Sequence, residues 1–98
     1  MPSKKLAVEW TESAAADLRG IVLGMFAKIK TECENLEKFP EMGKVPAELE
    51  ALQIGGYREL VVAPWRIFYR KDTERIVVLA VIDSRRNIDD AVWKRMMR

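Results

Sequence analysis

The sequence of 98 residues contains no histidine and a single cysteine, Cys33. Zinc sites and Ser-His-Asp triads depend on these residue types, so their scarcity argues against both kinds of site. One cysteine cannot form an internal disulfide, which is consistent with a reducing compartment, and we expect a cytoplasmic protein. Cys33 falls on an apolar helical stripe, which indicates a packed thiol.

Apolar runs long enough to span a membrane, repeats and low-complexity segments are also lacking. The N-terminus leads directly into a short strand pattern, so the sequence predicts neither a signal peptide nor a membrane span. With 49% hydrophobic residues, the chain has enough apolar surface for one core. We therefore expect a single domain over residues 1–98, with no cofactor and no membrane partner.

Arginine is scarce in the first half, where Arg19 stands alone, whereas residues 51–98 contain eight arginines. The planar guanidinium matches phosphates and carboxylates in bidentate geometry. This asymmetry suggests an anion-binding face for RNA, DNA or an acidic protein segment. The alternative is a solvated basic edge of a sheet.

The stretch from Tyr57 to Arg86 contains three strand patterns. Alternating runs at 57–62 and 65–70 flank Ala63-Pro64, as in a hairpin with a two-residue loop. The alternation predicts an apolar face made of Leu60, Val62, Trp65, Ile67 and Tyr69. The opposite face is then the cationic one, made of Tyr57, Glu59, Val61, Arg66, Phe68 and Arg70. A continuous apolar run at 76–82 predicts a third strand that is covered on both faces or lies centrally in the sheet.

Residues 6–10 form a further strand pattern, and Thr11 can cap a helix that follows it. Apolar residues then recur in helical phase until Pro40 stops the pattern. A single helix over 12–38 would be about 40 Å long. It would overhang a small domain and suggest a homodimer through this region. The alternative is a break near Gly20–Gly24, which gives two short helices.

The C-terminal segment predicts one short helix. Asn87 is a suitable N-cap, and Lys94, Arg95 and Arg98 complement the C-terminal end of the helix dipole. We favour packing of this helix on the sheet over its displacement by a partner.

Four segments together resemble the RelE/ParE superfamily of bacterial toxins from type II toxin–antitoxin pairs. They are WTESAAADL (10–18), LEKFPEMGK (36–44), YRELVVAPWRIFYR (57–70) and VVLAVIDSRRN (77–87). The resemblance implies an α+β fold, with an antiparallel sheet of three or four strands, an N-terminal helix or helical hairpin, and a short C-terminal helix. It also implies an acidic antitoxin as partner. Only 20 residues separate Leu18 from Phe39, less room than the two full helices of the family usually have.

The RelE/ParE superfamily, which this sequence resembles, has two branches with different activities. One branch cleaves messenger RNA in the ribosomal A site without a metal, holding the scissile phosphate with basic side chains. Arg66, together with Arg85 or Arg86, matches the arginine positions of that branch, and Arg58 lies near a position that is usually lysine. Trp93 stands where many of these ribonucleases carry a tyrosine. The other branch inhibits DNA gyrase by binding and needs no catalytic set.

We therefore expect a toxin and favour ribosome-dependent mRNA cleavage, with Arg66, Arg85 and Arg86 as catalytic residues. Arg58, Arg70, Tyr57 and Trp93 are the expected binding residues. A DNA gyrase inhibitor is the close alternative. A third possibility is a non-toxic relative that only binds an antitoxin or itself.

Each side chain also has a structural alternative. Arg66 can be a solvated strand arginine, and Asp83 can pair with Arg85 or Arg86. Trp65 and Trp93 can belong to the core.

Overall fold

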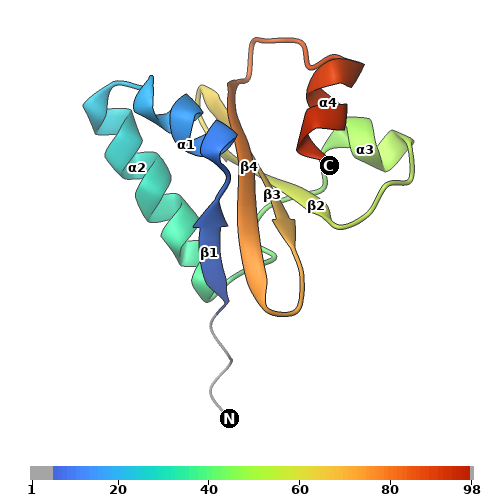
Figure 1. The fold of residues 1–98 in the computed structure, drawn as a ribbon, viewed down its shortest axis with the longest axis horizontal. Helices are drawn as coiled ribbons and strands as arrows, with labels where there is room; N and C mark the ends of the chain where they lie inside the picture. The colour runs from blue at the N-terminus through green and yellow to red at the C-terminus, as the bar shows by residue number, and fades with distance from the viewer. Residues whose placement is uncertain (1–5, 98) are drawn as a thin grey trace.

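A four-stranded sheet in the order β1-β4-β3-β2 forms the centre of the molecule (Figure 1). The computed structural model describes residues 6–97, apart from the side chains of residues 90 and 91. Two pairings are antiparallel, that of β2 (Tyr57–Val62) with β3 (Trp65–Lys71) and that of β3 with β4 (Arg75–Asp83). Strand β1 (Ala7–Trp10) joins the edge parallel to β4. The expected α+β fold is confirmed, and β1 makes the sheet mixed.

The β2–β3 hairpin has the predicted register. Val62 lies opposite Trp65, and Leu60 lies opposite Ile67. Arg58 lies opposite Tyr69, as expected for a turn made by Ala63-Pro64. The two faces of the hairpin therefore carry the residues that the alternation predicts. The face expected to be cationic is nevertheless largely buried, with Phe68 and Glu59 2% and 3% exposed.

The N-terminal helical region consists of two helices, so a single helix over 12–38 is wrong. Helix α1 (Glu12–Arg19) ends at Gly20, and α2 (Leu23–Glu34) continues into the short 3-10 helix η1 (Asn35–Glu37). Val22 between them is extended (φ −56°, ψ 145°), which breaks the helical path. Glycine favours such a break because it costs about 1 kcal/mol in a helix interior. The overhang that suggested a homodimer is absent.

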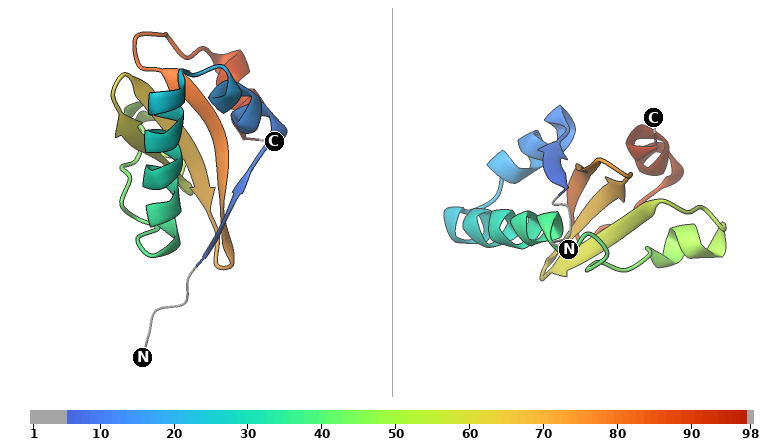
Figure 2. Two further views of the ribbon diagram at one scale, coloured as in Figure 1. Left: turned by 90° about the vertical axis from the view of Figure 1, so that its left-hand side faces the viewer. Right: turned by 90° about the horizontal axis from the view of Figure 1, so that it is seen from below.

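Helices cover both faces of the sheet (Figure 2). Helices α1 and α2 contribute to a core with Leu60, Ile67 and Tyr69 of the hairpin. Helices α3 (Ala47–Ala51) and α4 (Asp90–Met96) contribute to a second core on the opposite face, around Phe68. Strand β4 lies between β1 and β3 and supplies residues to both cores, as its continuous apolar run predicts.

Side chains near α1 extend the hydrogen bonding of β4 beyond the end of β1. Strand β1 stops at Trp10, opposite Val78. Further along β4, the Val81 N–H donates to Asp17 Oδ2 at 3.0 Å. Thr11 caps α1, as predicted, by accepting a hydrogen bond from the Ala14 N–H at 3.1 Å. Buried backbone N–H groups need hydrogen-bond partners. The segment WTESAAADL therefore has a structural role, because its Asp17 side chain accepts the hydrogen bond from the Val81 N–H.

Helix α4 packs on the sheet, as favoured, through Trp93 and Met96, which are both buried. Its N-cap is Asp89, and the expectation of Asn87 is wrong. Asp89 has an extended backbone, and its carboxylate accepts a hydrogen bond from the Val92 N–H at 3.1 Å. Lys94 and Arg95 lie in the last turn, as expected, whereas Arg98 lies outside the described residues.

No helix within residues 6–97 is both long enough and apolar enough to cross a membrane.

Candidate functional site

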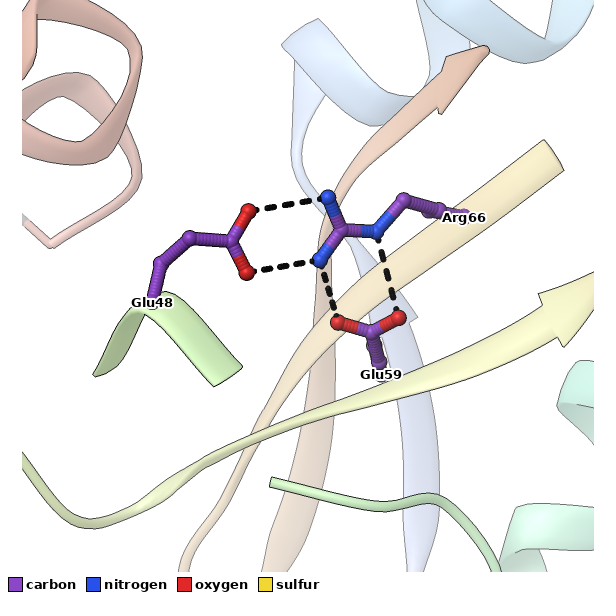
Figure 3. Close-up of polar contacts among 3 residues, drawn as sticks. All are labelled: Glu48, Glu59 and Arg66. Carbon is purple, nitrogen blue, oxygen red and sulfur yellow. Dashed lines mark hydrogen bonds and ion pairs between the residues drawn. The ribbon is translucent and has the colours of Figure 1, made fainter. Parts of the chain in front are cut away.

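The guanidinium of Arg66 on β3 is held by two carboxylates (Figure 3). Glu59, on the neighbouring strand β2, accepts from Nε at 3.1 Å and from Nη2 at 2.6 Å. Glu48, on α3, accepts from Nη1 and Nη2, both at 2.9 Å. The carboxylates lie on two different edges of the guanidinium. Four of its five N–H donors are therefore engaged within the chain.

Hydrogen bonds within this trio favour the charged forms of Arg66 and Glu48. The side chains of Glu59 and Arg66 are only 3% and 16% exposed, whereas that of Glu48 is 36% exposed. The hydrogen bonds to Glu48 and Glu59 raise the pKa of Arg66, and the hydrogen bond from Arg66 lowers the pKa of Glu48. Two carboxylates facing one guanidinium leave this trio with a formal charge of −1.

The hairpin register and the second core position these groups. Glu59 lies diagonally across from Arg66, because Val61 is the residue directly opposite it. Helix α3 fixes the backbone position of Glu48, because the neighbouring residue Leu49 is fully buried in the second core.

Aromatic side chains support the guanidinium from the sheet side. Arg66 Cζ lies 4.8 Å from the centroid of the Phe68 ring, within range of a cation–π contact. Phe68 in turn packs edge-on against Trp93, with 5.3 Å between ring centroids. Arg66 is thus part of the packing of the second face and is not a solvated strand arginine.

A pocket of about 480 Å³ opens beside Arg66. Its lining residues are Lys44, Val45, Ala47, Glu50, Glu59, Val61, Arg66 and Ser84. The two cations in this lining are matched by two glutamates, so the pocket offers no excess of positive charge to a phosphate.

The structure separates the expected binding residues. Arg58 lies on the other face of the hairpin, where its Nη1 donates to the Gly43 carbonyl at 2.8 Å. Arg70 and Tyr57 lie opposite each other on the face of Arg66, and both are half-buried. Trp93 is 7% exposed and packs in the second core.

Arg85 and Arg86 follow β4 and are both exposed. Arg85 forms an ion pair with Asp83, with Nη2 and Oδ2 2.6 Å apart. The hydrogen bond from Arg85 lowers the pKa of Asp83 to about 2. The backbone N–H of Arg86 donates to the Asp83 carbonyl at 3.0 Å. Within residues 6–97, no hydrogen bond or shared ion-pair partner connects either arginine to Arg66.

Tyr69 is buried and engaged, so it does not offer a free phenol. Its hydroxyl accepts from the Gly43 N–H and donates to the Pro40 carbonyl, both at 3.0 Å. Burial raises the pKa of Tyr69. Cys33 is equally withdrawn, because burial raises the pKa of its thiol to about 12. Among the described residues, no cluster of three or more potential metal ligands occurs either.

Sequence reasoning missed Glu48 and the pairing role of Glu59. The register places Glu59 diagonal to Arg66, so that pair could have been found. No local pattern points to Glu48, which lies 18 residues before Arg66 in the chain.

Known proteins place the chain in a family. The model of the family "ParE toxin of type II toxin-antitoxin system, parDE" matches residues 8–88. Toxin ParE3 of Caulobacter vibrioides is 29% identical over 68 residues. This match covers 69% of the chain and 64% of the relative, which is less than two thirds of the relative's length.

Three solved structures share the fold. The toxin–antitoxin complex RelBE2 of Mycobacterium tuberculosis has a TM-score of 0.66 at 24% identity, covering 81% of this chain and 91% of that one. A chromosomal ParDE system of P. aeruginosa has a TM-score of 0.64 at 22% identity, with coverages of 83% and 98%. A mutant of the E. coli toxin RelE in the free state has a TM-score of 0.70 at 13% identity, covering 95% of both chains. By its match over residues 8–88, the chain belongs to the ParE toxin family of type II toxin–antitoxin systems, within the RelE/ParE superfamily.

Proposed function

We propose that this protein is the toxin of a type II toxin–antitoxin module and that it acts by binding DNA gyrase, not by cleaving messenger RNA. The observation that carries the proposal is the double engagement of Arg66 by Glu48 and Glu59. A metal-independent ribonuclease needs cations that are free to stabilise the developing charge on a phosphate. This arginine already faces two carboxylates.

The other groups that the ribonuclease hypothesis needs are also committed elsewhere. Arg85 is paired with Asp83, and the Tyr69 hydroxyl has a backbone donor and a backbone acceptor. Trp93 is buried, and an indole cannot exchange a proton as a general acid does. These contacts favour the gyrase-binding alternative over the mRNA cleavage that the sequence favoured.

Exposed apolar side chains support a function in protein binding. Among residues 6–97, five of the seven exposed large hydrophobic residues fall between positions 39 and 61. They are Phe39, Met42, Val45, Leu52 and Val61. Val61 lines one hollow with Met42 and another with Val45, so these three lie close together. Contiguous exposed apolar surface is typical of interaction sites. We propose an antitoxin and the gyrase target as the two partners of this protein.

Pulse labelling after tightly controlled induction in a bacterial host tests the proposal. We expect thymidine incorporation to fall before methionine incorporation, because a blocked gyrase stops replication first. Methionine incorporation that falls first would support mRNA cleavage instead. If the variant Arg85→Ala/Arg86→Ala no longer caused the early fall in methionine incorporation, these exposed arginines would be identified as part of a ribonuclease site. If folded protein affects neither label, the non-toxic alternative holds.

A further inference from the structure

The turn between α1 and α2 presents two apolar side chains to solvent. Val22 and Leu23 are 74% and 81% exposed, more than any other large hydrophobic residue within residues 6–97. The neighbouring Ile21 is buried in the core beneath α1 and α2, and the N–H groups of Met25 and Phe26 donate to the Val22 carbonyl. These contacts hold the turn in place, on the opposite side of the molecule from α3 and α4 (Figure 1).

A hollow of about 470 Å³ lies close to this turn, between α1, α2 and β1. Leu23 lies on the side of α2 that faces the hollow, because it precedes the lining residues Phe26 and Lys30 by three and seven positions. One hairpin thus carries both an exposed apolar knob and an apolar hollow that can receive such a knob. The large apolar residues in the lining are Val8, Trp10, Leu18 and Phe26.

Two cations and two carboxylates also line the hollow, namely Arg19, Lys30, Glu34 and Glu37. Within residues 6–97, none of these four side chains forms an ion pair. The cations lie nearer the turn than the carboxylates do. An antiparallel copy of the same hairpin would therefore bring opposite charges together. A nucleic acid, in contrast, would meet a lining with no excess of positive charge.

We propose that the α1–α2 hairpin is the interface of a homodimer, in which two copies pair in antiparallel orientation about a twofold axis. Val22 and Leu23 of each copy enter the hollow of the other, so the same surface serves both subunits. Glu34 of one copy then lies near Arg19 of the partner subunit. It also lies near the N-terminal end of the partner's α2, a helix that has no side-chain cap and no acidic residue in its first turn.

This dimer goes beyond the proposed function. It rests on the exposed turn and the hollow, not on the single long helix that the sequence suggested.

Sedimentation equilibrium of the purified protein tests the proposal. We expect the average mass to rise from that of one chain towards that of two over roughly 1 μM to 1 mM protein. Leu23→Glu should raise the Kd of the dimer about a hundredfold, because each hollow would have to accept a carboxylate. Leu23 is largely exposed, so this variant should keep the circular dichroism spectrum of the wild type.

Leu52→Glu is the matched control. Leu52 is 65% exposed and ends α3, away from the hairpin, so its Kd should stay within about twofold of wild type.

Two charge reversals test the antiparallel orientation. Arg19→Glu and Glu34→Lys should each raise the Kd about fivefold, because each removes two exposed ion pairs from the dimer. The double variant Arg19→Glu/Glu34→Lys should return to within about twofold of wild type, because it restores both pairs in reverse. The proposal is overturned if the protein stays monomeric at every concentration, if Leu52→Glu weakens the dimer as much as Leu23→Glu, or if the double variant dimerises no more tightly than the single ones.

Discussion

Replacing Arg66 with alanine should lower the free energy of unfolding by about 3–5 kcal/mol, the range typical of removing one partner from a buried ion pair. The substitution leaves the carboxylate of Glu59, 3% exposed, without the guanidinium that accounts for both of its side-chain hydrogen bonds. It also removes the contact with the Phe68 ring. Urea denaturation followed by circular dichroism measures the change.

Arg70→Ala is the matched control for this experiment. Arg70 lies on the same strand and the same face and is half-buried, and it has no ion pair within residues 6–97. We expect it to lower stability by less than about 1 kcal/mol, as for most substitutions away from buried networks. The double variant Glu59→Leu/Arg66→Leu should recover much of the stability, since apolar replacement of a whole buried pair is often neutral. Equal stability of Arg66→Ala and Arg70→Ala would refute the account of the trio.

Gly43→Ala should be the second strongly destabilising substitution, with a loss of about 3 kcal/mol expected from overpacking. A Cβ at this position would lie 2.5 Å from the Glu59 carbonyl oxygen and 2.6 Å from the Tyr69 hydroxyl. Neither atom can move freely. The Glu59 backbone pairs with Lys44 through two hydrogen bonds, and the Tyr69 hydroxyl is bonded to Gly43 and Pro40.

Gly24→Ala is the comparison for Gly43→Ala, measured by the same denaturation. Gly24 lies in α2, and a Cβ there would meet nothing within 4 Å. Alanine should be neutral at this position or stabilising by up to about 1 kcal/mol, because it is the better helix former. If both variants unfolded at the same urea concentration, the close approach at Gly43 would not constrain the fold.

Much of the fold follows from local patterns in the sequence. Alternation around Ala63-Pro64 was sufficient to predict the register of the hairpin, and the run at 76–82 predicted a central strand. The choice between one helix and two could not be made from apolar spacing alone, since that spacing continues through the break at Gly20. The N-cap of α4 was equally open. Asn87 and Asp89 both suit the position, and the structure has Asp89, whose carboxylate accepts a hydrogen bond from the Val92 N–H.

The candidate site was harder to predict than the fold. Strand alternation correctly placed Arg66 and Arg70 on one face, which made that face look like a cationic surface. The groups that neutralise Arg66 come from two sources. Glu59 lies on the neighbouring strand of the hairpin. The position of Glu48 depends instead on how the segment before β2, which contains α3, folds back against the sheet. Tertiary packing decides that return, so no spacing rule could reveal the second carboxylate.

The most direct test of the central claim uses purified components. Relaxed plasmid is incubated with DNA gyrase and increasing amounts of the protein, and supercoiling is measured on agarose gels. Heat-denatured protein serves as the unfolded control. A protein that acts by binding should inhibit supercoiling in proportion to its ratio to gyrase, and it should leave messenger RNA on programmed ribosomes intact. Unimpaired supercoiling together with cleavage of that messenger RNA would contradict the account.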